Sequence, residues 1–489
     1  MEENVSKPGG GGNDVYKIKA EMEEKGSKLK RDLKSRHLFM ISIGGVIGTG
    51  IFVGSGYSIS QAGPLGAVLV YALTGVIMFI TMRCLGEMAV FMPVAGSFQV
   101  YATKFVSPGA GFSVGWFYWL NYAISIPFEV VISGEMMGRW VSHDIVPVWV
   151  WGTIFAIIYV ALNVFAVKYF GEAEFWFCSV KVIAILLFII LGICQLLGIL
   201  HTGDHASVGF GNFVIDGSLF PTSFGMLMTA FITVAFSYNG TEIIGLTAGE
   251  SSDPIKQLKR SVNNTAYRTL IFYVGAIFIL VLTVPWQNFV GVEFQESPFV
   301  MSLENFGLPF AGDIMNFVVI TSALSCGNSL LYSCMRLLFG MAGEGQAPKL
   351  LGKVSKNGVP VNAMIFTMII VCLYQLTAVY QPAVIALLLV AISSLAGMIN
   401  WAFICLSQIR FRGQYVRSGG NPDDLKFKMF GFPYVSWIGM ILNFAMIFSF
   451  VFLPGNLSML FYFLPAFVIL WLGFDFYYKK KHKNDGQVQ

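Results

Sequence analysis

Charged side chains are scarce in this chain of 489 residues: they make up 12%, against about 25% in an average soluble protein. Hydrophobic residues make up 56%, and the mean hydropathy is +0.69. This composition leaves too little charge to cover a surface exposed to water, and it is too apolar for a disordered scaffold. The sequence therefore excludes a soluble enzyme and predicts an all-α polytopic membrane protein.

Several chemical motifs are also missing. The 7 cysteines lie in apolar stretches without a CxxC pair, and the 5 histidines are scattered, so no disulfide framework or metal site is predicted. The motifs GxxxxGK[ST] and HExxH are absent, which argues against ATP-driven pumping and against a zinc-dependent protease. We expect no cofactor and no nucleic-acid partner. The polar N-terminus, up to Arg36, predicts no cleavable signal peptide.

What the sequence does contain is a series of apolar runs from Leu38 onward. About 20 apolar residues suffice to cross a bilayer. The runs predict twelve transmembrane helices, at roughly 38–61, 64–92, 112–138, 146–167, 174–199, 221–249, 267–286, 312–342, 361–380, 383–408, 433–453 and 457–477.

Lysine and arginine are distributed unevenly around these runs. Basic residues precede the first run and follow the sixth, eighth, tenth and last, whereas the loops 200–220, 287–311, 381–382 and 454–456 contain none. Cytoplasmic loops carry the excess of positive charge, so both termini are predicted to be cytoplasmic in a plasma-membrane protein. We expect the divisions 1–36 (N-terminal tail, with 1–27 disordered), 37–410 (ten-helix core), 411–478 (helices 11 and 12) and 479–489 (C-terminal tail).

Two of the predicted helices share a glycine-rich break. The first contains Gly48-Thr49-Gly50 and the sixth contains Gly240-Thr241. The second break lies five helices after the first, and because five is an odd number, the two broken helices run in opposite directions across the membrane. Interrupted helices in matching positions of two halves point to a transporter site. The pattern predicts an inverted five-plus-five repeat, at about 38–199 and 221–410, with helices 1 and 6 broken.

The break in the first helix has the chemistry of a binding site. Four glycines from Gly44 to Gly50 each weaken the helix by up to about 1 kcal/mol. Free N–H groups near Gly48 favour a carboxylate, and carbonyls near Val46 can accept from an ammonium. An α-amino acid carries both groups on adjacent atoms. The alternative is a small-residue face on which another helix packs.

Three charged residues lie inside apolar helices, where a charge costs about 2.5–3.5 kcal/mol on insertion scales. Glu129 and Glu242 are candidates for contacts with a substrate, or for structural hydrogen bonds and ion pairs. Lys181 is a candidate for a functional cation, or for a side chain that extends to the interface. Glu87, near a helix end, is expected to pair or to be solvated.

The chain resembles the amino-acid permeases of the amino acid–polyamine–organocation superfamily, and within them the lysine-specific permeases of bacteria. The resemblance extends over nearly the whole chain from Leu33. The residues that carry it are Ile43 to Gly50, Ala62-Gly63-Pro64, Gly86-Glu87, Pro93 to Phe98, Gly171 to Trp176, Phe236 to Glu242, Ala248 to Pro254 and Ser325 to Ser329.

The resemblance implies a role for particular residues. It implies that the backbone of Gly48, Thr49 and Gly50 binds an α-carboxylate. It places the α-amino group near the carbonyls of Val46, Phe236 and Asn239, with Phe236 as an aromatic gate. Lys181 matches a helix-5 lysine that occupies the place of a coupling sodium ion in proton-coupled relatives.

We therefore expect proton-driven import of L-lysine across the lipid bilayer, with Lys181 as the proton-coupling residue. A buried ammonium needs an anionic or polar partner, and Glu129 is the candidate. The remaining candidates around the substrate are Asn121, Tyr122, Ser237, Glu242, Ser393 and Ser394. The alternatives are a permease for arginine, histidine or an aromatic amino acid, an exchanger of the same fold, and a membrane-embedded lysine sensor.

Overall fold

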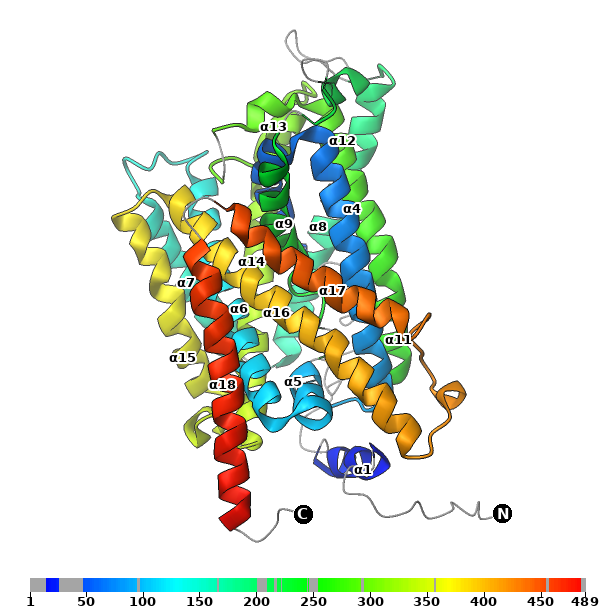
Figure 1. The fold of residues 1–489 in the computed structure, drawn as a ribbon. Coiled ribbons are helices and arrows are strands. Elements are labelled where there is room, and N and C mark those ends of the chain that lie inside the picture. The colour runs from blue at the N-terminus through cyan, green and yellow to red at the C-terminus, as the bar shows by residue number, and fades with distance from the viewer. Residues whose placement is uncertain are drawn as a thin grey trace.

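The computed structural model describes residues 15–25, 47–94, 97–164, 167–199, 209–214, 218–220, 222–243, 245, 254–291, 294–355, 358–453 and 457–484. Within these ranges the chain forms helices and turns, and no β-strand element occurs among them. The longer helices pack side by side along one direction of an elongated bundle (Figure 1).

Along the chain up to residue 196 the elements are α1 (Val15–Lys25), α3 (Thr49–Phe52), α4 (Gly54–Phe91), α5 (Ser97–Tyr101), η2 (Ala102–Val106), α6 (Pro108–Met137), α7 (Val148–Val164) and α8 (Val167–Leu196). After residue 196 they are η3 (Phe210–Phe213), α9 (Phe224–Tyr238), α11 (Pro254–Arg268), η5 (Thr269–Gly275), α12 (Ala276–Thr283), η6 (Trp286–Phe289), α13 (Pro298–Glu304), α14 (Ala311–Gly343), η7 (Lys349–Gly352), α15 (Val361–Val371), η8 (Cys372–Ala378), α16 (Pro382–Arg417), η9 (Pro422–Asp424), α17 (Tyr434–Phe448), η10 (Ser449–Phe452) and α18 (Leu457–Asn484).

Eight helices in the described residues are long and apolar enough to cross a membrane. α7 and α9 are apolar but shorter. α4 contains the end of the first predicted span and nearly the whole of the second. Its axis breaks between them at Gly63, whose φ of 71° and ψ of 175° suit only glycine. Pro64 then begins the second segment. The structure thus supports a polytopic all-α protein, while the count of twelve and the inverted repeat stay predictions.

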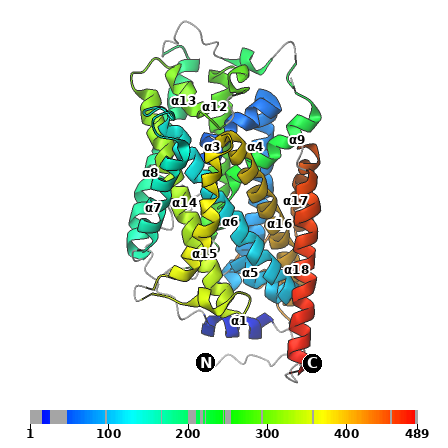
Figure 2. The same cartoon turned by 90° about the vertical axis from the view of Figure 1, so that its left-hand side faces the viewer.

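The first and last described helices meet the same end of the bundle. α1 lies across that end, and the C-terminal part of α18 extends beside it (Figures 1 and 2). Which side of the membrane this end faces stays a prediction from the distribution of lysine and arginine.

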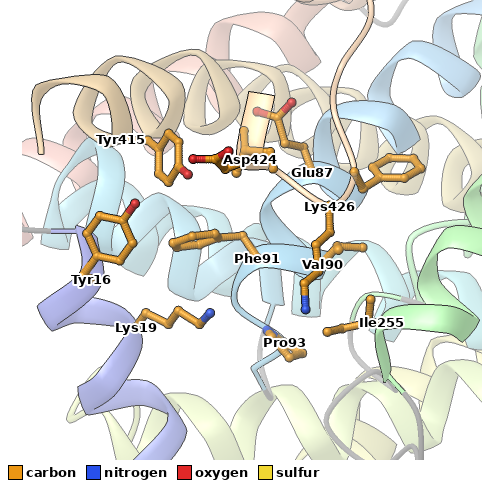
Figure 3. Close-up of a pocket in the computed structure, with 12 residues that line it drawn as sticks. Tyr16, Lys19, Glu87, Val90, Phe91, Pro93, Ile255, Tyr415, Asp424 and Lys426 are labelled. Carbon is orange, nitrogen blue, oxygen red and sulfur yellow. The ribbon is translucent and has the colours of Figure 1, made fainter. Parts of the chain in front are cut away.

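The expectation of a disordered segment 1–27 is wrong for Val15–Lys25, which forms α1. Val15 is fully buried, and its N–H donates to Ser418 Oγ at 3.3 Å. The ring of Tyr16 lies 5.9 Å from Tyr415 and 6.2 Å from Phe91 between centroids. These apolar contacts hold the helix, although its mixed charge suggested disorder. Beside them lies a cavity of about 320 Å³, lined among others by the residues that Figure 3 labels.

Glu87 forms a buried structural ion pair at the same end of the bundle. Arg412 Nε donates to its Oε1 at 2.8 Å, and the other guanidinium nitrogen Nη2 contacts Oε2. Gln408 Nε2 and the N–H of Met429 donate to the same carboxylate, at 2.9 and 2.5 Å. Every oxygen therefore has a donor, and this carboxylate ties α4 to α16 and to the segment after it.

We expect Glu87→Gln to destabilise the protein by about 3–5 kcal/mol, because it leaves the Arg412 guanidinium buried without a counter-ion. The measurement is the melting temperature of the purified protein in detergent. Asp423→Asn is the matched control: it removes an exposed pair with Lys428, at 2.7 Å, and should change the melting temperature little. Equal shifts in the two variants would show that the buried ion pair contributes no more to stability than the exposed one.

Glu135 and Arg139 are four residues apart near the end of α6, a spacing that favours a local ion pair, but they do not pair with each other. Arg139 instead bonds to Glu304 and Asp313, each at 2.7 Å, and so joins the end of α6 to α13 and α14. Glu135 faces His143, with 3.8 Å between its Oε2 and His143 Nε2. The long-range partners lie in α13 and α14, so helical spacing within α6 could not indicate them.

Candidate binding site at two broken helices

The first helix break is visible from Ile47 onward; Val46 and Gly44 lie outside the described residues. Gly48 is extended, with φ of −116° and ψ of −166°, and Thr49 begins the short helix α3. A single residue, Val53, joins α3 to α4, and its N–H still donates to Thr49 O at 2.8 Å. The chain therefore enters a helix in the buried interior, where the first N–H groups have no helical acceptor.

Side chains of three other helices hold this break. The carbonyl of Ile47 accepts from Lys181 Nζ of α8 and from Ser322 Oγ of α14, both at 2.9 Å. Lys181 is fully buried, so the alternative in which its side chain extends to the interface is wrong. Glu129 of α6 accepts the Thr49 hydroxyl at 2.7 Å on Oε2.

Two glycines allow the close approach of these helices. A Cβ at position 48 would lie 2.8 Å from Cys326 Sγ and 3.1 Å from Glu129 Oε1. A Cβ at position 50 would lie 2.8 Å from the Cα of Ser237 on α9. The packing leaves no room for a side chain at either position, and this explains the glycines at the break.

The second break follows α9. That helix ends at Tyr238, Asn239 turns away with ψ of 144°, and Gly240 takes a φ of 91°, which favours glycine. The freed carbonyl of Ser237 accepts from Tyr273 OH at 3.0 Å. A hydroxyl thus satisfies a carbonyl that the helix leaves without a partner.

A polar network surrounds Asn239. Its Nδ2 donates to Asn121 Oδ1 of α6 and to Ser393 Oγ of α16, both at 3.1 Å. Ser393 Oγ also donates to Asn121 Oδ1 at 2.6 Å and lies 2.7 Å from Ser125 Oγ. The break in the sixth helix is therefore linked to two long helices by side chains rather than by backbone bonds.

Between the two breaks lies a cavity of about 10 Å³, room for about one water molecule. Its lining residues come from α3, α6, α9, α14 and the segments beside them. They are Gly48, Gly50, Ser125, Glu129, Phe236, Ser237, Asn239, Cys326 and Leu330. The structure thus gathers six of the predicted residues at one point: Gly48, Gly50, Glu129, Phe236, Ser237 and Asn239.

Other predicted residues lie outside this lining. Asn121 contacts two residues that line the cavity, Asn239 and Ser125, and Thr49 directs its hydroxyl to Glu129. Ser394 donates to Ile232 O of α9 at 2.8 Å and is not among the lining residues, so its contact with a substrate stays a prediction. The neighbouring Ser393 is the residue that joins the network.

Glu242 and Tyr122 form a separate polar group. Tyr122 OH donates to Glu242 Oε1 at 3.4 Å, and the hydroxyl of Tyr118 contacts that of Tyr122. Glu242 is fully buried and does not line the cavity. This position fits the interpretation in which Glu242 braces the broken sixth helix.

Sequence reasoning missed Ser125, Ser322, Cys326 and Leu330. A signal existed for Ser125, because Asn121, Ser125 and Glu129 recur every four residues and so lie on one face of α6. Cys326 lies in an apolar run, and this position gives no signal that its thiol faces Gly48 at the first break.

Comparison with known proteins places this arrangement in a family. The model of the amino acid permease family matches residues 37–486. The amino-acid permease RocE of Bacillus subtilis is 44% identical, over 96% of this chain and 99% of the relative. A putative histidine permease of the same organism is 42% identical, over 93% and 95%. The lysine-specific permease LysP of Escherichia coli is 38% identical, over 91% and 93%.

These matches extend over nearly all of this chain and of each relative. Together with the apolar helices, the permease relatives indicate a multi-pass protein of the plasma membrane. The family consists of transporters, and the broken helices with their glycines lie within the matched region. The chain belongs to the amino acid permease family.

Proposed function

We propose that the protein is a secondary active importer of a cationic amino acid, with L-lysine as the first candidate, driven by the proton gradient. One observation carries the substrate class: the cavity between the broken helices is lined by the carboxylate of Glu129. In the described residues no lysine or arginine forms an ion pair with it. A buried carboxylate of this kind favours a cationic ligand.

In this proposal the substrate spans the gap between the breaks. Its α-carboxylate binds the backbone N–H groups of Gly48, Thr49 and Gly50, and its α-amino group binds carbonyls of both broken helices. The cavity has to widen first, since about 10 Å³ holds no amino acid. Phe236 lines the cavity from α9 and is the side chain proposed to move as the gate.

Glu129 also has to move. It now bonds the Thr49 hydroxyl at the start of α3, close to the place proposed for the substrate carboxylate. Two carboxylates at one helix start repel each other. We therefore propose that Glu129 turns toward the side-chain ammonium when the substrate binds.

The relatives bear names of several substrates, including histidine, lysine, γ-aminobutyric acid and aromatic amino acids. A permease for arginine, histidine or an aromatic amino acid is thus the second candidate, and an exchanger is the third. A lysine sensor of the same fold is a weaker proposal, supported only by the binding site.

Uptake of radiolabelled L-lysine into proteoliposomes, with and without an imposed pH gradient, tests the function. The proposal requires accumulation that depends on the gradient and that excess unlabelled lysine competes away. Uptake that needs internal amino acid and ignores the gradient would establish an exchanger. Competition by arginine, histidine or an aromatic amino acid, but not by lysine, would transfer the proposal to that substrate.

We expect Glu129→Gln to weaken lysine binding by about 10- to 100-fold and to affect a neutral amino acid of similar length much less. The reason is that a desolvated ammonium without an anionic partner costs several kcal/mol. The measurement is competition against bound substrate by both amino acids.

Glu242→Gln is the matched control for this experiment. It removes a second buried carboxylate that lies outside the cavity lining. It should change the affinities for the cationic and the neutral amino acid to the same extent. Equal losses for both amino acids in Glu129→Gln would instead assign Glu129 to the structure of the helix break, and a selectivity change confined to Glu242→Gln would place the side-chain site at the sixth helix.

A further inference from the structure

Glu174 is a second buried carboxylate that the binding site does not use. It lies on α8 and is fully buried. Its Oε1 accepts from Ser325 Oγ of α14 at 2.5 Å and from Cys178 Sγ at 3.3 Å, while its Oε2 has no partner among the described residues. No described lysine or arginine lies within ion-pair distance. Glu174 is the first residue of the candidate membrane span Glu174–Leu196. A buried carboxylate there is costly, so one without a counter-ion needs a functional explanation.

Its position relates it to Lys181. Seven residues separate the two on α8, which is two helical turns and about 10 Å, so both side chains lie on one face. Cys178 lies between them on the same face. Glu174 lies nearer the start of α8, toward the end of the bundle where α1 lies (Figure 2).

A second helix bridges the same two residues. On α14, Ser322 and Ser325 are one turn apart. Ser322 donates to Ile47 O, the carbonyl that Lys181 also binds, and Ser325 donates to Glu174. Two serines of α14 thus bond at the two ends of this stretch, one to the carbonyl that Lys181 binds and one to Glu174.

Few other ionisable groups surround Glu174. α14, α12 and η5 pack on α8. α14 brings Cys326 next to Ser325, α12 contains no titratable residue, and η5 contains Tyr273, whose hydroxyl bonds to Ser237 O. On its own helix the ionisable neighbours are Glu172, Cys178 and Lys181, and α14 also carries Tyr332 and Arg336 further along the chain.

We propose that Glu174 is a second proton-binding residue, which receives the proton from Lys181 and passes it toward the cytoplasm. This inference rests on the proposed proton coupling. Transfer from the Lys181 ammonium to the Glu174 carboxylate leaves a neutral amine and a carboxylic acid. Glu174 then releases the proton to water at the α1 end and becomes a carboxylate again. The Lys181 amine takes up a new proton from the opposite side of the membrane, so charge and atoms balance over the cycle.

Glu174→Gln tests the proposal, because it keeps a hydrogen-bond acceptor but cannot carry the proton. Accumulation of radiolabelled L-lysine driven by an imposed pH gradient should fall by about tenfold or more. Counterflow exchange, which needs no net proton movement, should stay within about twofold of the wild type. Wild-type accumulation in Glu174→Gln would overturn the proposal. Absence of gradient-driven accumulation in the wild type would instead contradict the proposed function, which is proton-driven import.

Ser325→Ala is the second variant, and it keeps the carboxylate. Removing a donor to Glu174 disfavours its charged form, so release of the proton should need a higher internal pH. We expect the pH at which gradient-driven uptake is half-maximal to move upward, with exchange unaffected. An unchanged pH profile in this variant would also overturn the proposal, even if Glu174→Gln fails to fold.

Discussion

Gly48→Ala is expected to weaken substrate binding by about 10- to 100-fold, the range that an overpacked core of about 1–3 kcal/mol predicts. The added methyl group would lie 2.8 Å from Cys326 Sγ and 3.1 Å from Glu129 Oε1. With φ of −116°, the backbone at this position suits any residue, so the effect comes from space and not from strain. Either the methyl group displaces α3 from its partners, or it covers the N–H groups that are proposed to bind the carboxylate.

Binding of radiolabelled lysine to the purified protein measures this effect, together with the melting temperature. Gly340→Ala is the matched control, since a Cβ there has no atom within 4 Å and the residue lies inside α14. It should bind as the wild type does. Cadaverine, which lacks the carboxylate, should compete poorly with lysine. Wild-type affinity in Gly48→Ala, or strong competition by cadaverine, would show that the substrate carboxylate does not bind at the helix break.

The place of this site could be predicted from the sequence because its cause is local. Glycines clustered in an apolar run break a helix wherever the chain packs, and Gly48 and Gly240 do lie beside the two breaks. A buried charge is similarly visible, since an apolar run that contains Glu129 or Lys181 has to bury it.

The partners of these groups could not be predicted, because they come from distant segments. The structure places Lys181 Nζ at Ile47 O, a carbonyl that it shares with Ser322. Spacing along a helix reveals a common face, but not which carbonyl of another helix meets that face. The same limit applies to Arg139, whose partners Glu304 and Asp313 lie far along the chain.

Lys181→Ala is expected to abolish proton-driven accumulation of substrate and to leave slow equilibrative exchange. The buried ammonium holds the Ile47 carbonyl at 2.9 Å, one residue before the proposed carboxylate site. In the neutral form the amine donates less strongly, so the carbonyl and the helix break are released. Proton occupancy at Lys181 and substrate affinity at Gly48 are then linked, and the linkage works equally in both directions.

The measurement is lysine accumulation in proteoliposomes at several imposed pH gradients, with counterflow exchange as the measure of binding and folding. Ser322→Ala is the matched control, because it removes the other donor to Ile47 O but no titratable group. It should lower affinity while accumulation still rises with the gradient. If Ser322→Ala and Lys181→Ala behave alike, the carbonyl needs only a hydrogen bond, and the proton is carried elsewhere. If Lys181→Ala still concentrates lysine against its gradient, the coupling site lies at another buried acid, and Glu242 becomes the first candidate because it is fully buried beside the second helix break.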